Sequence, residues 1–332
     1  MAQNGEKTEV GGDEEQEQEK EAEETKEEEV GDMEWEEVVK SGGSVSFIEP
    51  NMEDSAVWLS PPGHSFQVRG PQYLTTKVKI AGSEPLFKPL AFDWLRSGSR
   101  IDSILEHPNS RVRSALDRAT ATEEAAGVSK KKKPFVWAFN LQVPSKEHFS
   151  AIAYFVTYTD FTEDSMCGRF LKGDDAYRNT RLKLIANIVE GPWIVKTAVG
   201  EHAICILGRS LTCRYLQGAN FLEVDVDIGS SMVANAIVHL AIGYITTLTV
   251  DLAFLIEAQT EEELPEKLLG TIRLKKLDLT AAVPIELLST DGVVTAAGGS
   301  FPARLWKSIG QGFSTFLQSG NQNQYDSDDE AY

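Results

Sequence analysis

The sequence predicts an α+β fold in which a curled antiparallel sheet packs around one long buried apolar helix. Two observations predict the sheet: short runs rich in β-branched and aromatic residues, and turn-forming residues that separate those runs. The third observation is residues 232–258, the most apolar stretch, which we expect to form the helix. We place this single domain at about residues 45–295 of the 332-residue chain.

The first 44 residues predict a disordered acidic tail. Residues 1–40 hold 17 Asp and Glu against 4 Lys and Arg, with few apolar residues to bury. The segment Trp35–Val38 is an exception, because it places an aromatic residue and a valine among acids. It predicts either a segment that docks on the domain or a short motif that binds a protein partner by adding a strand.

Charge and cysteine usage exclude several classes of protein. The net charge is −19, but residues 41–320 carry only −2, which argues against a nucleic-acid partner. No signal-peptide pattern opens the chain, so we expect a cytoplasmic protein that is not secreted. The three cysteines read as reduced thiols, and no Cys or His spacing predicts a metal or another cofactor. They are Cys167, Cys205 and Cys213.

Residues 42–134 are dense in turn formers, with short strands such as residues 77–81 between them. Four consecutive lysines lie near the end of this region: Lys130, Lys131, Lys132 and Lys133. One interpretation is a solvated loop. The other is attraction to anionic lipid headgroups, which contributes about 1 kcal/mol per lysine near a membrane surface.

The middle of the domain predicts strands around one helix. Residues 135–143 and 151–159 read as two strands, and residues 164–190 as a helix broken at Gly173. An antiparallel meander follows over residues 193–199, 203–215 and 221–228. In its last strand three carboxylates alternate with apolar residues, so we expect a solvated face bearing Glu223, Asp225 and Asp227.

Residues 232–258 are apolar around the whole helical circumference, which is typical of a helix that is either buried or membrane-spanning. Asn235, His239 and Asp251 disfavour a membrane span, because polar groups are costly in hydrocarbon. We therefore predict a buried core helix, with a span as the alternative. A half-exposed strand is expected at residues 271–279.

The C-terminal region predicts an amphipathic helix over residues 296–320 and a disordered acidic tail over residues 321–332, where Ser327 is a candidate kinase target. Its uncharged polar face is typical of helices that insert into membranes, although docking on the domain uses the same pattern. The candidate membrane-insertion residues are Leu305, Trp306, Ile309, Phe313, Phe316 and Leu317.

The sequence contains no nucleophile elbow, zinc-protease motif, phosphate-binding loop or complete dinucleotide-binding motif. We therefore name no catalytic residues and expect no enzyme. An uncharacterised enzyme stays as an alternative, because a triad is defined by geometry and not by spacing.

Five segments resemble the C-terminal domain of Enhanced Disease Resistance 2 proteins: FQVRGPQYL (66–74), FLKGDDAYRN (170–179), IVEGPW (188–193), FLEVDVDIGSS (221–231) and ELPE (263–266). The resemblance runs from about Trp58 to Leu279. In that family this domain often follows a pleckstrin-homology domain and a lipid-binding START domain, and members are linked to phosphoinositide binding and to restraint of plant immunity. Because about 57 residues precede Trp58, we expect a stand-alone version without those domains.

The resemblance implies an intracellular, lipid-associated or peripheral membrane protein, and a regulator of plant defence signalling. A sheet around a helix leaves room for a lipid chain, so we predict a lipid or a membrane surface as partner. The candidate headgroup contacts, besides the four lysines, are Arg69, Lys172, Arg178, Arg181 and Lys183. The alternatives are ion pairs of these arginines with Asp174, Asp175 and Glu190, and a protein-interaction adaptor that uses the acidic tail without a lipid pocket.

Overall fold

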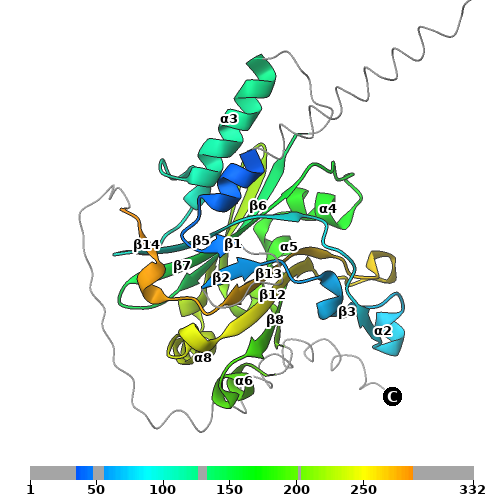
Figure 1. The fold of residues 1–332 in the computed structure, drawn as a ribbon. Coiled ribbons are helices and arrows are strands. Elements are labelled where there is room, and N and C mark those ends of the chain that lie inside the picture. Colours follow the sequence, from blue (N-terminus) through cyan, green and yellow to red (C-terminus); the bar gives the residue numbers. More distant parts are fainter. Residues whose placement is uncertain (1–34, 48–55, 126–132, 201–202, 287–332) are drawn as a thin grey trace, which may run out of the picture.

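The computed structural model describes residues 35–47, 56–125, 133–200 and 203–286. It is an α+β structure in which two six-stranded sheets pack face to face (Figure 1). The strands of the first sheet are, in spatial order, β1 (Ser46–Phe47), β2 (Val57–Leu59), β13 (Leu268–Lys275), β12 (Thr249–Ile256), β8 (Leu182–Glu190) and β9 (Ala203–Ile206).

The second sheet contains β10 (Thr212–Gln217), β11 (Phe221–Asp227), β6 (Phe135–Val143), β7 (His148–Thr157), β5 (Lys88–Ser97) and β14 (Val283–Pro284). Neighbouring strands are antiparallel, except for the parallel pairs β1–β2, β11–β6 and β14–β5. A two-stranded ribbon belongs to neither sheet and consists of β3 (Gln67–Arg69) and β4 (Lys79–Ala81). Val68 of this ribbon packs with Ala253 and Leu255 on the face of the first sheet that is turned away from the core between the sheets.

The helices are short and lie outside the two sheets. Residues 35–41 are helical, and the other α-helices are α2 (Tyr73–Thr76), α3 (Arg111–Ala125), α4 (Met166–Lys172), α5 (Asp175–Asn179), α6 (Trp193–Val199), α7 (Leu207–Ser210) and α8 (Met232–Ile242). The single-turn 3₁₀ helices are η1 (Gly63–Ser65), η2 (Ile104–Glu106), η3 (Ile228–Ser230), η4 (Ile245–Thr247), η5 (Glu261–Glu263) and η6 (Leu279–Ala281). Figure 1 shows α3 at the top of the molecule and α6 and α8 at the bottom.

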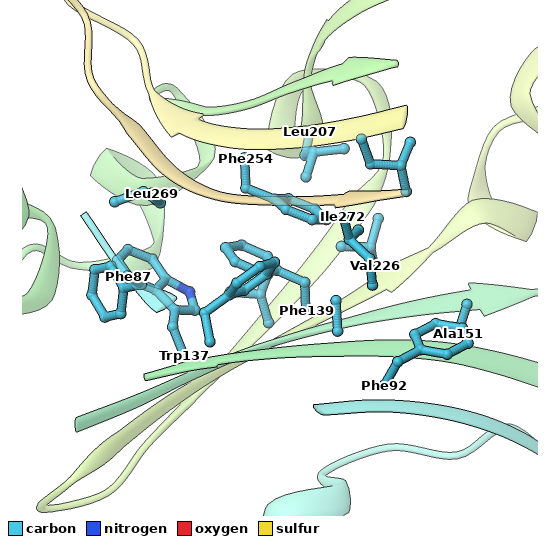
Figure 2. Packing of buried hydrophobic residues seen from close by; sticks show 14 of the residues in the cluster. Phe87, Phe92, Trp137, Phe139, Ala151, Leu207, Val226, Phe254, Leu269 and Ile272 are labelled. Carbon is cyan, nitrogen blue, oxygen red and sulfur yellow. The ribbon is translucent and has the colours of Figure 1, made fainter. Parts of the chain in front are cut away.

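Aromatic side chains fill the space between the two sheets. Phe139 of the second sheet stacks on Phe254 of the first, with ring centroids 3.9 Å apart and an interplanar angle of 9° (Figure 2). Trp137 stacks on Phe139, and Phe155 meets Phe254 edge-on. Among the described residues these buried rings therefore occupy the interior in which we expected a lipid cavity.

The expected long buried helix over residues 232–258 is not confirmed. The helical part, α8, ends at Ile242, and β12 occupies the centre of the first sheet between β13 and β8. Both faces of β12 are buried: Phe254 points into the core between the sheets, while Ala253 and Leu255 pack on the opposite side. A strand buried on both faces is apolar at nearly every position, so its periodicity resembles that of a buried helix.

Three other elements differ from the sequence predictions. The second half of the expected helix over residues 164–190 is strand β8, and the expected strand over residues 193–199 is helix α6. Residues 203–215 contain two strands in different sheets, with α7 between them. The error at α6 has a local cause, because the Gly191–Pro192 turn that follows β8 leads directly into the new helix, with Pro192 at its N-cap.

Helices pack on both sheets. Segments η2 and α3 bury Leu105 and Leu116 against the second sheet, where they meet Ile152 and Tyr154. Helices α6 and α8 pack on each other and on the first sheet through Val195 and Ile237, which meet Ile188 and Val250. Val250 also packs against the core between the sheets, so these two helices lie at the edge of that core. Within the described part of the chain, no helix is long and apolar enough to cross a membrane.

Candidate functional site

Helix α8 is apolar in sequence yet lies at the surface. Ser231 begins it as the N-cap, with its hydroxyl accepting a hydrogen bond from the backbone N–H of Ala234 at 3.3 Å. Ile237 is the only residue of α8 that is fully buried, and Met232 is 70% exposed. Packing against the first sheet therefore accounts for only part of the helix's apolar character.

Helix α6 brings a second set of exposed apolar side chains next to α8. Gly191 allows the turn from β8 into α6, because its φ of +148° and its close approach to Leu248 both disfavour a side chain. Trp193, the first residue of α6, is 76% exposed. We define the α6–α8 patch as the exposed large apolar residues of these helices, of the end of β8 and of the turn after α8: Val189, Trp193, Ile194, Met232 and Tyr244.

Basic groups lie near this patch. The exposed Lys196 of α6 donates a hydrogen bond to the Val189 carbonyl at 3.2 Å and forms no ion pair among the described residues. The backbone N–H of Lys276 donates to the Leu248 carbonyl at 2.7 Å, which places this lysine beside η4. The acidic Glu190 accepts a hydrogen bond from Thr249 at 3.0 Å.

Three of the predicted headgroup-binding residues lie close together, but each of them forms an ion pair with a carboxylate of the protein. Arg69 pairs with Glu257 at 2.9 Å, Arg181 pairs with Glu263 at 2.6 Å, and Lys183 contacts Glu266 directly. Burial lowers the pKa of Lys183, while the Glu266 charge opposes that change. This cluster ties the β3 ribbon and β8 to the residues after β12, so its cations already have partners within the fold.

The remaining predicted cations behave differently. Arg178 is buried, donates to the carbonyls of Phe170 and Leu171 at 3.0 and 2.7 Å, and lies over the Tyr215 ring. Its pair with Asp175, at 3.4 Å, is one that we considered from the sequence. Lys172 is exposed and contacts Glu163.

The carboxylates of β11 were expected on a solvated face, and that expectation is wrong. Glu223 has no exposed surface and accepts hydrogen bonds from the backbone N–H groups of Ile104 and Leu105, both at 2.8 Å. Asp225 accepts from the N–H of Ser103 at 3.0 Å, because the segment around η2 covers this face. Burial, followed by the charge of Asp225, raises the pKa of Glu223 well above its ordinary value.

The described residues offer neither a group of metal ligands nor a reactive thiol. No three His, Cys, Asp or Glu side chains in the described ranges are grouped to hold a metal ion. Burial raises the pKa of Cys167 and of Cys213 to about 12, and it also raises the pKa of Cys205. These three thiols are therefore protonated at neutral pH and poor nucleophiles.

The segment Trp35–Val38 lies within the helical residues 35–41. The Trp35 indole N–H donates to the Tyr158 hydroxyl at 3.1 Å, and that hydroxyl donates to Glu36 at 2.9 Å. Val38 points away from this contact and is 57% exposed. The segment is thus docked as a helix, and Val38 is its accessible apolar side chain.

Several predicted site residues fall outside the described ranges. They are Lys130, Lys131, Lys132 and Ser327, together with the six candidate membrane-insertion residues from Leu305 to Leu317. Lys133 is described and lines a cavity of about 600 Å³ together with Arg113 and Phe135. The exposed Trp193 and Met232 were missed from the sequence, because we assigned them to a strand and to a buried helix.

The comparison with known families covers most of the described fold. The family model described as "Protein ENHANCED DISEASE RESISTANCE 2, C-terminal" matches residues 58–278. The chain belongs to this family. The match confirms the resemblance found in the sequence, and it includes both α6 and α8.

A curated relative from Arabidopsis thaliana, "Protein ENHANCED DISEASE RESISTANCE 2-like", is 39% identical to this chain over 226 residues. The matched region is 68% of this chain and 29% of the relative. The chain therefore matches less than a third of the length of that Enhanced Disease Resistance 2-like protein.

Proposed function

We propose that this Enhanced Disease Resistance 2 C-terminal domain is a non-catalytic binding module that docks on membrane surfaces through the α6–α8 patch. The observation that carries the proposal is the exposure of Trp193 and Met232 on two neighbouring helices. Large apolar side chains gathered at a surface are typical of a binding site, and Trp and Tyr favour the membrane–water interface. Tyr244 supplies the second aromatic residue.

The magnitudes support a reversible attachment. Removing one large apolar side chain from water contributes about 1.5–3 kcal/mol, and a lysine near an anionic surface adds about 1 kcal/mol. Trp193 and Met232 together with Lys196 therefore supply several kcal/mol, which is a peripheral interaction and far weaker than a membrane span.

Vesicle flotation of the full chain tests this proposal. We expect wild-type protein to float with vesicles that contain anionic lipid, and the double variant Trp193→Glu, Met232→Glu to bind at least tenfold more weakly, because both insertions are lost. Val78→Glu is the matched control, since Val78 is 56% exposed and lies before β4, outside the patch. Equal flotation of the double variant and the control would contradict membrane docking through this patch.

For the biological role, we propose a regulator of plant defence. The support is membership of the Enhanced Disease Resistance 2 family and the 39% identity to a relative from Arabidopsis thaliana. Loss of the gene product in a plant host should change the response to a pathogen, and a null line with an unaltered response would contradict this role.

A protein-partner role is the second candidate, and the exposed Val38 favours it. A partner that binds the docked helix would contact Val38 and leave the Trp35–Tyr158 hydrogen bond in place. We expect Val38→Asp to reduce the recovery of such a partner in pull-down from plant extract, whereas Val78→Asp should not. Identical partner profiles for wild-type protein and Val38→Asp would remove this surface from consideration.

A further inference from the structure

A second apolar surface lies at one end of the sandwich, apart from the α6–α8 patch. A groove of about 560 Å³ opens between α4 and the residues from η5 to β13. Its apolar walls include Phe161, Met166, Leu264, Ile256 and Leu269. Ile256 and Leu269 are also members of the core between the sheets, so the groove extends to the hydrophobic interior.

The rim of this groove carries charges of both signs. Lys267 is exposed at the rim and pairs with no carboxylate among the described residues. Asp164 and Glu262 are also exposed there, and hydrogen bonds from its own backbone and from Thr260 lower the pKa of Glu262. Glu262 is therefore ionised at neutral pH.

One carboxylate of the groove, Glu263, is shared by two arginines. Glu263 pairs with Arg169 at 2.9 Å and with Arg181 at 2.6 Å, and it also accepts the backbone N–H of Gln259 at 2.7 Å. Besides this cluster, the charged groups that line the groove are one ammonium group, on Lys267, and two carboxylates, on Asp164 and Glu262.

We propose that this groove binds a single-chain zwitterionic phospholipid of the lysophosphatidylcholine class. The acyl chain would lie along the apolar walls, the phosphate would meet Lys267, and the ligand's quaternary ammonium would meet Asp164 and Glu262. The volume lies within the range of pockets that bind small ligands, about 300–1,000 Å³. A free fatty acid is disfavoured, because it offers the two carboxylates nothing but like charge.

The groove shares no residue with the α6–α8 patch. The inference rests on the proposed function only in taking a lipid as the ligand, and the two sites can fail independently. Membrane docking requires a bilayer, whereas the groove should bind a monomeric amphiphile in solution.

Isothermal titration of the full chain with lysophosphatidylcholine, below its micelle concentration, tests the groove. We expect saturable binding, and a loss of at least tenfold in affinity for Met166→Trp, which fills the groove, and for Lys267→Glu, which repels the phosphate. Val78→Trp introduces the same side chain outside the groove and should bind like wild type. Thermal unfolding of each variant identifies any that fail to fold, and Lys267→Glu provides an exposed substitution if Met166→Trp does not fold.

Three results would overturn the inference: no saturable binding to wild type, unchanged affinity in folded Met166→Trp or Lys267→Glu, or equal affinity for a free fatty acid of the same chain length. The double variant Trp193→Glu, Met232→Glu should retain wild-type affinity for the monomeric lipid. Retained binding in solution together with lost flotation would separate the groove from the patch.

Discussion

Glu223 places a carboxyl group under η2, where two backbone N–H groups point at its oxygens. These hydrogen bonds hold η2 against β11, so the carboxyl organises the outer layer of the second sheet. Asn140 connects the same cluster to β6 by donating to Asp225 at 2.7 Å. Burial is the largest cause of the raised pKa of Glu223, and the neighbouring Asp225 charge acts in the same direction.

This raised pKa predicts a pH dependence of stability. The folded protein holds a proton on Glu223 at pH values where the unfolded chain has released it, because an unfolded Glu titrates near 4.3. The folded state then binds more protons, so the free energy of unfolding falls as pH rises from about 4.3 toward the folded pKa, by at most about 1.4 kcal/mol per pH unit for one proton.

Glu223→Gln should flatten that slope, since the amide stays neutral while its oxygen still accepts a backbone hydrogen bond. Urea unfolding of wild type and variant from pH 5 to pH 8 measures it, with Glu163→Gln as an exposed control that should keep the wild-type slope. Parallel pH profiles for Glu223→Gln and wild type would show that Glu223 carries no such proton.

Candidate site residues were less predictable than strands. The sequence identifies which side chains are basic, but Arg69 and Lys183 meet Glu257 and Glu266 only after β8 and the residues following β12 come together. The sequence did not single out Lys267, because its availability depends on how the residues around it fold; within the described ranges it pairs with no carboxylate. Carboxylates that are distant in sequence therefore determine which basic side chains remain available to bind a ligand.

At the scale of elements, β12 and α8 belong to the same apolar stretch of sequence but differ in burial. Phe254 of β12 stacks on Phe139 and is fully buried, while Met232 of α8 is mostly exposed. Phe254→Ala should destabilise the protein by about 3–5 kcal/mol, because it removes a stacked ring and leaves a cavity. Met232→Ala should change the free energy of unfolding by less than about 0.5 kcal/mol.

Chemical denaturation of both variants measures this difference. Similar losses for Phe254→Ala and Met232→Ala would mean that α8 contributes to the core as much as β12 does. That result would also weaken the assignment of the α6–α8 patch as a binding surface.

The elements that were predicted correctly share a clear physical signature. Strands β6 and β7 are flanked by turn formers and rich in residues that fit a pleated surface, and they lie close to the expected residues. We predicted a helix at β8 and a strand at α6. The length and composition of both segments allow either structure, and the contacts with the surrounding sheet determine which one forms. We expected the carboxylates of β11 to be solvated, and that prediction was wrong. The alternation of polar and apolar residues along a strand does not reveal that another segment, here η2, covers the polar face.

At the scale of the whole molecule, the sandwich is a support with two separate outward-facing surfaces. The aromatic interior fixes the relative positions of the sheets, and Figure 1 shows α6 and α8 at one end while α4 lies elsewhere on the molecule. The α6–α8 patch and the groove beside α4 are therefore placed by one rigid core. A membrane contact at one surface leaves the other open to a ligand in solution.

The order of the strands along the chain has a consequence for the folding of the domain and for its transfer between genes. Along the chain, strands enter the two layers in turn, so β1 and β2 join one layer, β5 to β7 the other, and the exchange continues to β14. No single break in the polypeptide chain would therefore place one sheet in each fragment. Five strand pairings, among them β13–β2 and β14–β5, join distant parts of the polypeptide, so the domain should fold slowly and as one cooperative unit. Recombination should therefore transfer the domain only as a whole.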